Sequence, residues 1–186
     1  VASFSILADM VEVVGGEHVT VTSIVGPDSD AHVYSPSVSD ARAVAVADII
    51  FVNGLGFEGW ISDLVSAAEA SAPVIIATEA ITPLIIEGEA DPHAWNALAN
   101  AKLYADNIVS GLSTLLPAHA DAFAANAATF KSEVDTLLSS ATARFAALPE
   151  GRRTVVTGHD AFGYFEAQFG LTFLALRQAC LADAPP

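Results

Sequence analysis

The sequence has one cysteine, few cationic residues and no long apolar run, and each shortage excludes a class of protein. Cys180 alone cannot form an intramolecular disulfide, and it offers no thiolate pair for a metal site. Seven lysines and arginines face 22 acidic residues, a formal net charge of −15, so no basic stripe is available to neutralise nucleic-acid phosphates. Residues 43–52 come nearest to a membrane span, but Asp48 interrupts them well short of the roughly 18 apolar residues that a span needs.

The chain has 186 residues, 53% of them apolar, which is enough to bury a core without stabilising disulfides or structural metal ions. Its acidic surface raises the local concentration of cations. Residues 1–4 show neither the charged region nor the apolar region of a signal peptide. We therefore expect any signal peptide to have been removed or never to have existed.

The first hundred residues alternate between strand patterns and helix patterns. Runs that are β-branched or continuously apolar predict strands over residues 1–7, 19–25, 49–52 and 74–77. Helical periodicity predicts helices between these strands, over residues 8–14, from a cap at Ser37 or Ser39 to about 47, and over 57–70. Strands that are apolar on both faces and alternate with helices are typical of a parallel sheet covered by helices, so the sequence predicts an α/β fold.

The second half of the sequence begins with two long helical patterns in place of the strand–helix alternation. Helical patterns cover residues 100–116 and 118–148, and the later helix has a length of about 45 Å at about 1.5 Å per residue. A compact first lobe cannot cover a helix of that length, so we expect it to run on to a second lobe. A strand, a helix and a strand then follow, too few elements to bury both faces of a sheet. We predict an N-terminal lobe over 1–116, a connecting helix over 117–148 and a partial second lobe over 149–186.

Three of the five histidines, His32, His93 and His159, lie in turns beside acidic residues. His32 and His159 follow predicted strands, and ligands of open parallel sheets bind beyond the carboxyl ends of strands. Imidazole is the commonest metal ligand, and three neutral nitrogens suit Zn²⁺. We expect the other two, His18 and His119, to be solvated. The spacing alone leaves open a metal-free α/β interaction module in which the three histidines are incidental.

Other motifs that carry chemistry are incomplete. Residues 53–58 (NGLGFE) lack the third glycine of a dinucleotide-binding loop and the lysine of a P-loop, so we interpret them as a turn between a strand and a helix. The chain has no Gly-x-Ser-x-Gly elbow of a serine hydrolase. No acid/base pair can be positioned from the sequence.

Four motifs nevertheless occur together in the order of one family: residues 30–36 (DAHVYSP), 51–60 (FVNGLGFEGW), 91–95 (DPHAW) and 159–164 (HDAFGY). The chain resembles the cluster A-I solute-binding proteins of bacterial zinc and manganese ABC transporters. Among these it is most similar to zinc-specific members of the AztC type, over residues 1 to about 175. The resemblance implies two Rossmann-like α/β lobes, joined by one long rigid helix, with the metal bound in the cleft between them.

The resemblance also implies a site and a role. His32 and His93 would bind the metal from the first lobe and His159 from the second. A histidine in the third position implies Zn(II) as the bound solute rather than Mn(II), for which a carboxylate is usual. It further implies a periplasmic protein, not an enzyme, that hands zinc to an ABC permease in the inner membrane. We expect a monomer, with a periplasmic metallochaperone as a further candidate partner, and Asp91 and Asp160 as acceptors that orient the histidines.

Some features depart from the family. The second lobe is shorter, and the family's fourth ligand, an aspartate late in that lobe, has no counterpart. We expect a chain that is truncated or lacks an internal segment, with water, a neighbouring molecule or nothing in the fourth position. Residues 84–90 contain no histidine, unlike the histidine-rich loop of zinc-binding relatives. Three histidines and an open water position also fit a zinc hydrolase or hydratase, which is the alternative function.

Overall fold

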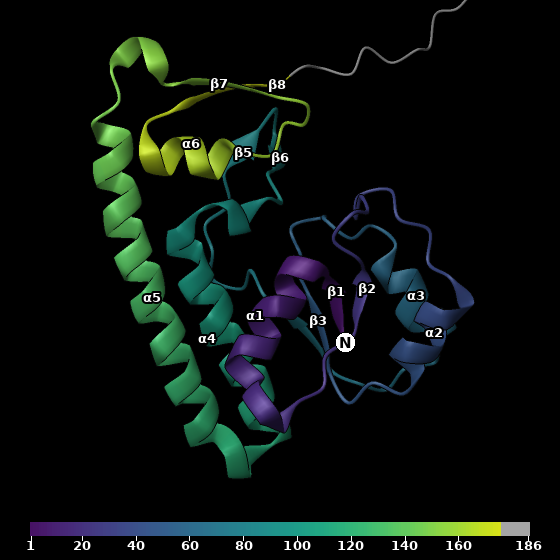
Figure 1. Ribbon diagram of the computed structural model, residues 1–186. Helices are drawn as coiled ribbons and strands as arrows, with labels where there is room; N and C mark the ends of the chain where they lie inside the picture. The colour runs from purple at the N-terminus through teal and green to yellow at the C-terminus, as the bar shows by residue number, and fades with distance from the viewer. Residues whose placement is uncertain (176–186) are drawn as a thin grey trace, which may run out of the picture.

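The structure is a computed structural model that describes residues 1–175 (Figure 1), so Cys180 and residues 176–186 of the predicted second lobe lie outside the described residues. Its centre is a parallel sheet of four short strands. These are β1 (Ala2–Phe4), β2 (Ser23–Val25), β3 (Ile50–Val52) and β4 (Val74–Ile76), in the order β2-β1-β3-β4. All neighbouring strands are parallel, so the carboxyl ends of all four lie at one edge. The chain moves outward from β1 to β2 and then crosses to β3 on the other side of β1, which makes the carboxyl ends of β1 and β3 the point where the strand order reverses.

Helices cover both faces of this sheet (Figure 1). On one side lie α1 (Ser5–Gly15) and α4 (Leu98–Leu115), and on the other lie α2 (Val38–Ala45) and α3 (Ile61–Ala67). The long helix α5 (Ala120–Ala146) forms an outer layer against α1 and α4. Short 3₁₀ turns complete the path: η1 (Gly16–His18), η2 (Ala94–Asn96), η3 (Pro117–His119) and η4 (Glu150–Arg152).

The core lies between the sheet and the α1–α4 layer. All three residues of β3 are buried, and α4 packs a stripe of Tyr104, Ile108 and Leu112 at helical spacing. Gly111 sits where α4 crosses the sheet, and a Cβ there would lie 3.2 Å from Phe51 Cε1. The absence of a side chain at Gly111 therefore brings α4 directly onto the strands.

A smaller unit follows α5. It contains β7 (Thr154–Thr157), α6 (Gly163–Phe169) and β8 (Thr172–Ala175), with β7 and β8 paired in parallel. Phe145, near the end of α5, packs against Phe165 and Phe169 of α6, with ring centroids 5.6 and 4.9 Å away. We call residues 154–175 the β7–α6–β8 unit.

A hairpin lies beside this unit. Its strands β5 (Ile85–Ile86) and β6 (Glu89–Ala90) pair in antiparallel register. Glu87 and Gly88, between the strands, both have positive φ, the conformation that a tight two-residue hairpin turn requires.

The predicted α/β fold class is confirmed, and so is the helix cap at Ser37, whose side chain forms a capping box with Asp40. The predicted strand over 1–7 is wrong after Phe4, because α1 begins at Ser5 and buries Leu7, Val11 and Val14 at helical spacing. Of the strand predicted over 19–25, the structure forms only β2 (Ser23–Val25). The boundaries at 116 and 148 stay a prediction. Over residues 1–175, no helix is both long and apolar enough to cross a membrane.

Candidate metal centre

The three predicted ligands come from three separate loops that meet beyond the carboxyl ends of the strands. His32 lies in the loop between β2 and α2, and His93 lies between β6 and η2. His159 lies between β7 and α6. The topology therefore brings together residues that are 61 and 66 positions apart in the sequence.

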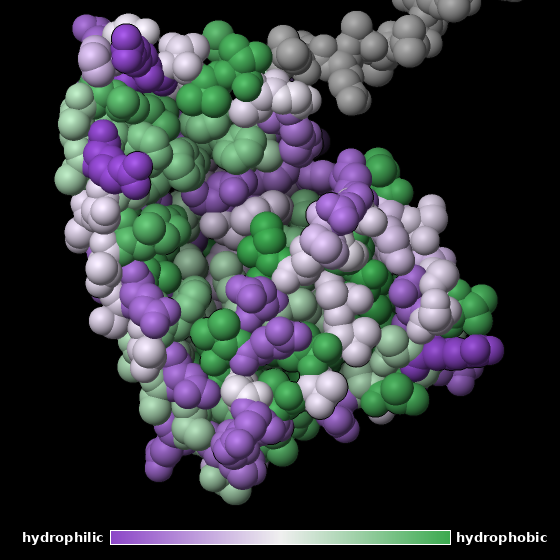
Figure 2. All heavy atoms as spheres, in the orientation of Figure 1, coloured by the Kyte–Doolittle hydropathy of each residue, from purple (hydrophilic) through white to green (hydrophobic). Residues whose placement is uncertain are grey.

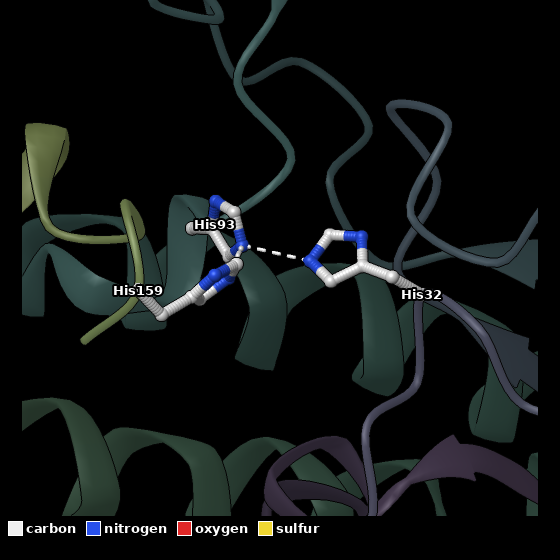
Figure 3. Close-up of side chains that lie close together, drawn as sticks. All are labelled: His32, His93 and His159. Atoms are coloured by element: carbon white, nitrogen blue, oxygen red, sulfur yellow. Dashed lines mark hydrogen bonds between the residues drawn. The ribbon is translucent and has the colours of Figure 1, made fainter. Parts of the chain in front are cut away.

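The ring nitrogens of these histidines converge (Figure 3). His32 Nε2 lies 2.9 Å from His93 Nε2, and His159 Nε2 lies 3.2 Å from the same atom. One ligand atom of each residue lies within 4.8 Å of the other two. Two nitrogens that share a tetrahedral Zn²⁺ at about 2.0–2.1 Å stand roughly 3.3 Å apart, so the observed spacing is close to that of a metal site.

Asp91 fixes the orientation of the His93 ring. Its Oδ1 lies 2.7 Å from His93 Nδ1 and accepts the His93 backbone N–H at 3.0 Å. Both residues are buried. A proton on Nδ1 leaves the lone pair of Nε2 free to face the other two histidines. Asp160, the second predicted acceptor, makes no such contact within residues 1–175, because it is exposed in the turn before α6.

The three imidazoles cannot satisfy one another's hydrogen bonds when His93 carries its proton on Nδ1. Nε2 of His93 then has a single lone pair, which cannot accept protons from His32 and His159 together. A cation among the three nitrogens would use all three lone pairs at once. The arrangement thus has the donor set of a transition-metal site.

His32 is half-buried against an aromatic wall. Its ring meets Phe57 edge to face with centroids 4.7 Å apart, and Phe57 in turn packs on Trp95. Burial, with the nearby His93 ring as a smaller cause, lowers the pKa of His32 below its usual 6.5. This keeps the imidazole neutral, the form that binds metal. Asp30 Oδ1 accepts the His32 backbone N–H at 2.9 Å and does not contact the ring through a hydrogen bond.

A buried network under the site was not predicted from the sequence. The Asn53 amide donates to Pro92 O at 2.9 Å and accepts from the Tyr104 hydroxyl, which places the loop of His93 over β3. Glu58 accepts from the backbone of Asn53 at 2.6 Å and from Ser3 Oγ at 2.5 Å. Burial raises the pKa of Glu58. The run at 53–58 is therefore a turn, as predicted, and its polar residues also support the site.

The hollow beside the histidines is small. It has a volume of about 190 Å³ and is lined by His32, His93 and His159 together with Phe57 and Trp95. Sites for organic ligands usually have volumes of about 300–1,000 Å³. The space suits an ion better than an organic substrate.

His18 and His119 lie apart from this cluster. Their rings stack on each other with centroids 4.0 Å apart and planes 21° apart, and both are half-buried rather than solvated. In stacked rings the nitrogen lone pairs lie in nearly parallel planes and do not point to a shared position between the rings, so this pair does not resemble a metal site.

An α/β fold in which imidazoles converge beyond the strand ends has the architecture of a metal-ion-binding protein. The comparison with known families is specific: the profile described as "Zinc-uptake complex component A periplasmic" (ZnuA) matches residues 1–186. The chain belongs to this family, which consists of solute-binding proteins of metal ABC transporters and not of enzymes. The expectation that the protein is not an enzyme is thereby confirmed.

The sequence is similar to those of relatives whose names specify different metals. The chain is 35% identical over 181 residues to the manganese-binding lipoprotein MntA of Bacillus subtilis, covering 95% of this chain and 59% of MntA. It is 31% identical over 175 residues to the iron-binding protein YfeA of Yersinia pestis, covering 91% of this chain and 56% of YfeA. The chain thus spans less than three fifths of the length of these relatives.

Solved structures agree with the fold. A crystal structure of ZnuA superposes with a TM-score of 0.87 at 30% identity, covering 94% of this chain and 69% of that one. A cadmium-bound periplasmic metal-binding protein from candidatus Liberibacter asiaticus gives a TM-score of 0.86 at 30% identity, covering 94% and 67%. The named metals of these proteins vary, so the family does not itself select zinc.

Proposed function

We propose that the chain binds one divalent transition-metal ion through His32, His93 and His159. The observation that carries this proposal is the convergence of three Nε2 atoms, two of them 2.9 and 3.2 Å from the third. The lowered pKa of His32 and the hydrogen bond that His93 Nδ1–H donates to Asp91 keep the rings in the state that binds metal. A water molecule would complete a tetrahedral site.

We propose zinc as that ion. Imidazole nitrogen is a ligand of intermediate softness that suits Zn²⁺, whereas Mn²⁺ prefers carboxylate and water oxygen. The three converging side chains offer nitrogen only. Names of relatives point to manganese and iron as well as zinc, so the choice rests on the donor set of this chain.

We propose that the protein acts in the periplasm and delivers zinc to an ABC permease, as its family membership suggests. Its acidity fits capture of a cation, because Arg42 is the sole lysine or arginine before Lys102. We also propose the division into a lobe at 1–116, a helix at 117–148 and a second unit from 149. Packing of α5 on α1 and α4, and of its end on α6, supports this division.

Calorimetry with Zn²⁺, Mn²⁺ and Fe²⁺ tests the function. The wild-type chain should bind one Zn²⁺ tightly and Mn²⁺ far more weakly. His93→Ala should reduce zinc affinity by more than the roughly 100-fold of an outer-sphere change. His119→Ala is the matched control, since it removes a half-buried imidazole outside the cluster and should leave affinity unchanged. Equal zinc affinity of wild type and His93→Ala would refute the site.

A further inference from the structure

His159 is the proposed ligand whose position is least fixed by the residues next to it in the sequence. The side chain is exposed, and its loop lies between a two-stranded sheet and a short helix. Within the β7–α6–β8 unit, the hydrogen bond that reaches this residue runs from Thr157 Oγ1 to His159 O at 3.0 Å. The backbone there needs further support if the ring is to stay beside His93.

Tyr164 supplies one tie from α6. Its buried hydroxyl donates to Asp91 O at 2.8 Å and accepts the Leu84 N–H at 3.1 Å. Leu84 and Asp91 close the base of the β5–β6 hairpin, where Asp91 N–H donates to Leu84 O at 2.8 Å. Burial raises the pKa of Tyr164, so the hydroxyl keeps its proton and remains a donor.

Asn96 supplies a second tie from η2. Its Nδ2 donates to Ala161 O at 2.7 Å, and Ala161 is buried two residues after His159. The side chain of Asn96 is three residues beyond His93. One segment, residues 91–96, therefore carries the His93 ligand and both partners that hold the loop of His159.

Helix α6 and residues 91–96 are in close contact at Gly163. A Cβ on Gly163 would lie 3.1 Å from Asp91 Oδ2, tighter than ordinary van der Waals contact. The first residue of α6 thus lies directly on the carboxylate whose other oxygen orients His93. A shift of α6 toward residues 91–96 would bring Gly163 into collision with Asp91, the residue that orients the His93 ring.

We infer that Tyr164 and Asn96 are positioning residues, which act on the metal through His159 by fastening its loop to residues 91–96. The inference rests on the proposed metal function and adds how the third ligand is placed. Neither residue is one of the three proposed ligands. Loss of either tie leaves the His93–His32 pair intact and frees His159.

A double-mutant cycle read by zinc calorimetry tests this inference. Tyr164→Phe, which removes the hydroxyl alone, should weaken zinc binding about tenfold in the wild-type background, within the roughly 10–100-fold of outer-sphere changes. In a His159→Ala background the same substitution should weaken binding less than twofold, because its route to the metal is already lost. Asn96→Leu should behave in the same way in both backgrounds.

Co²⁺ absorption gives a readout that fold stability does not move. The visible spectrum of the Co²⁺-loaded Tyr164→Phe protein should shift toward that of His159→Ala, as one nitrogen leaves the ion. Asn126→Ala is the control, because it removes a hydrogen bond to Val14 O between α5 and α1 far from the site and should change neither spectrum nor affinity.

The inference would be overturned if each substitution, Tyr164→Phe and Asn96→Leu, weakened zinc binding by the same factor in the wild-type and His159→Ala backgrounds and left the Co²⁺ spectrum unchanged. A wild-type chain that binds no zinc, or a His93→Ala variant that binds it normally, would instead refute the proposed function.

Discussion

The four-stranded sheet and the β7–α6–β8 unit place metal ligands in different ways. Strand β3 is wholly buried between helical layers, and His93 above it is buried with its ring held by Asp91. In the smaller unit, Val155, Val156 and Leu174 are exposed by 38 to 61%, and Figure 2 shows hydrophobic surface at this end of the molecule. The comparison indicates that one part of the site is fixed by core packing and the other by a few hydrogen bonds.

The largest expected contrast is in stability. Phe51→Ala should lower the free energy of unfolding by about 3–5 kcal/mol, because it empties a fully buried position between β3 and α4. Leu174→Ala, at a side chain that is 53% exposed, should change it by less than about 0.5 kcal/mol. Urea denaturation measures both. Similar losses for the two variants would mean that the smaller unit is as well packed as the sheet.

The second contrast concerns the carboxylates beside the ligands. Asp91→Asn should weaken zinc binding about 10–100-fold, since the amide loses the charge that supports Nδ1–H of His93. Asp160→Asn should leave zinc affinity unchanged, because Asp160 is exposed and has no hydrogen bond to a ligand ring within residues 1–175. Isothermal calorimetry distinguishes the two, and a matching loss for Asp160→Asn would contradict the geometry.

The third contrast separates the ligands themselves in the metal-free protein. His93→Ala should lower the free energy of unfolding by about 1–3 kcal/mol, because the buried Asp91 carboxylate loses its ring partner. His159→Ala removes an exposed ring and should leave thermal unfolding nearly unchanged. Melting curves recorded in a chelator provide the comparison. A destabilised His159→Ala protein would show that the loop contributes more to folding than its exposure suggests.

The smallest expected effect is the pH dependence at His32. Its pKa is lowered in the folded protein, so the unfolded chain binds its proton more readily. This residue's contribution to stability is therefore complete above about pH 6.5 and falls as the pH drops through the folded pKa. Zinc affinity should fall over the same range. His32→Gln should flatten the acid limb of metal-free stability between pH 7 and 5, and an unchanged profile would contradict the assignment.

Much of this organisation is readable from local sequence. The strand–helix alternation predicts the sheet, the apolar stripe through 118–148 predicts α5, and the turns predict where three histidines emerge. Each of these depends on the order of neighbouring residues alone. For the same reason the start of α1 was missed, because the apolar run at 1–7 satisfies a strand and a helix equally well.

The support of the site was not readable in this way. The hydrogen bond from Asn53 Nδ2 to Pro92 O joins residues 39 positions apart, and that from the Leu84 N–H to the Tyr164 hydroxyl joins residues 80 apart. No local pattern marks such pairs. A polar residue directly after a buried strand, as Asn53 is, gives the one usable signal, since its position at the strand ends puts it beneath any ligand bound there.

The central claim is that three imidazole nitrogens share one ion. Crystals of the zinc-loaded chain, measured on both sides of the zinc absorption edge, test it most directly. We predict a single strong anomalous peak about 2.0–2.1 Å from Nε2 of His32, His93 and His159. A peak at another place, or rings turned away from one another in the zinc-loaded crystal, would contradict the account.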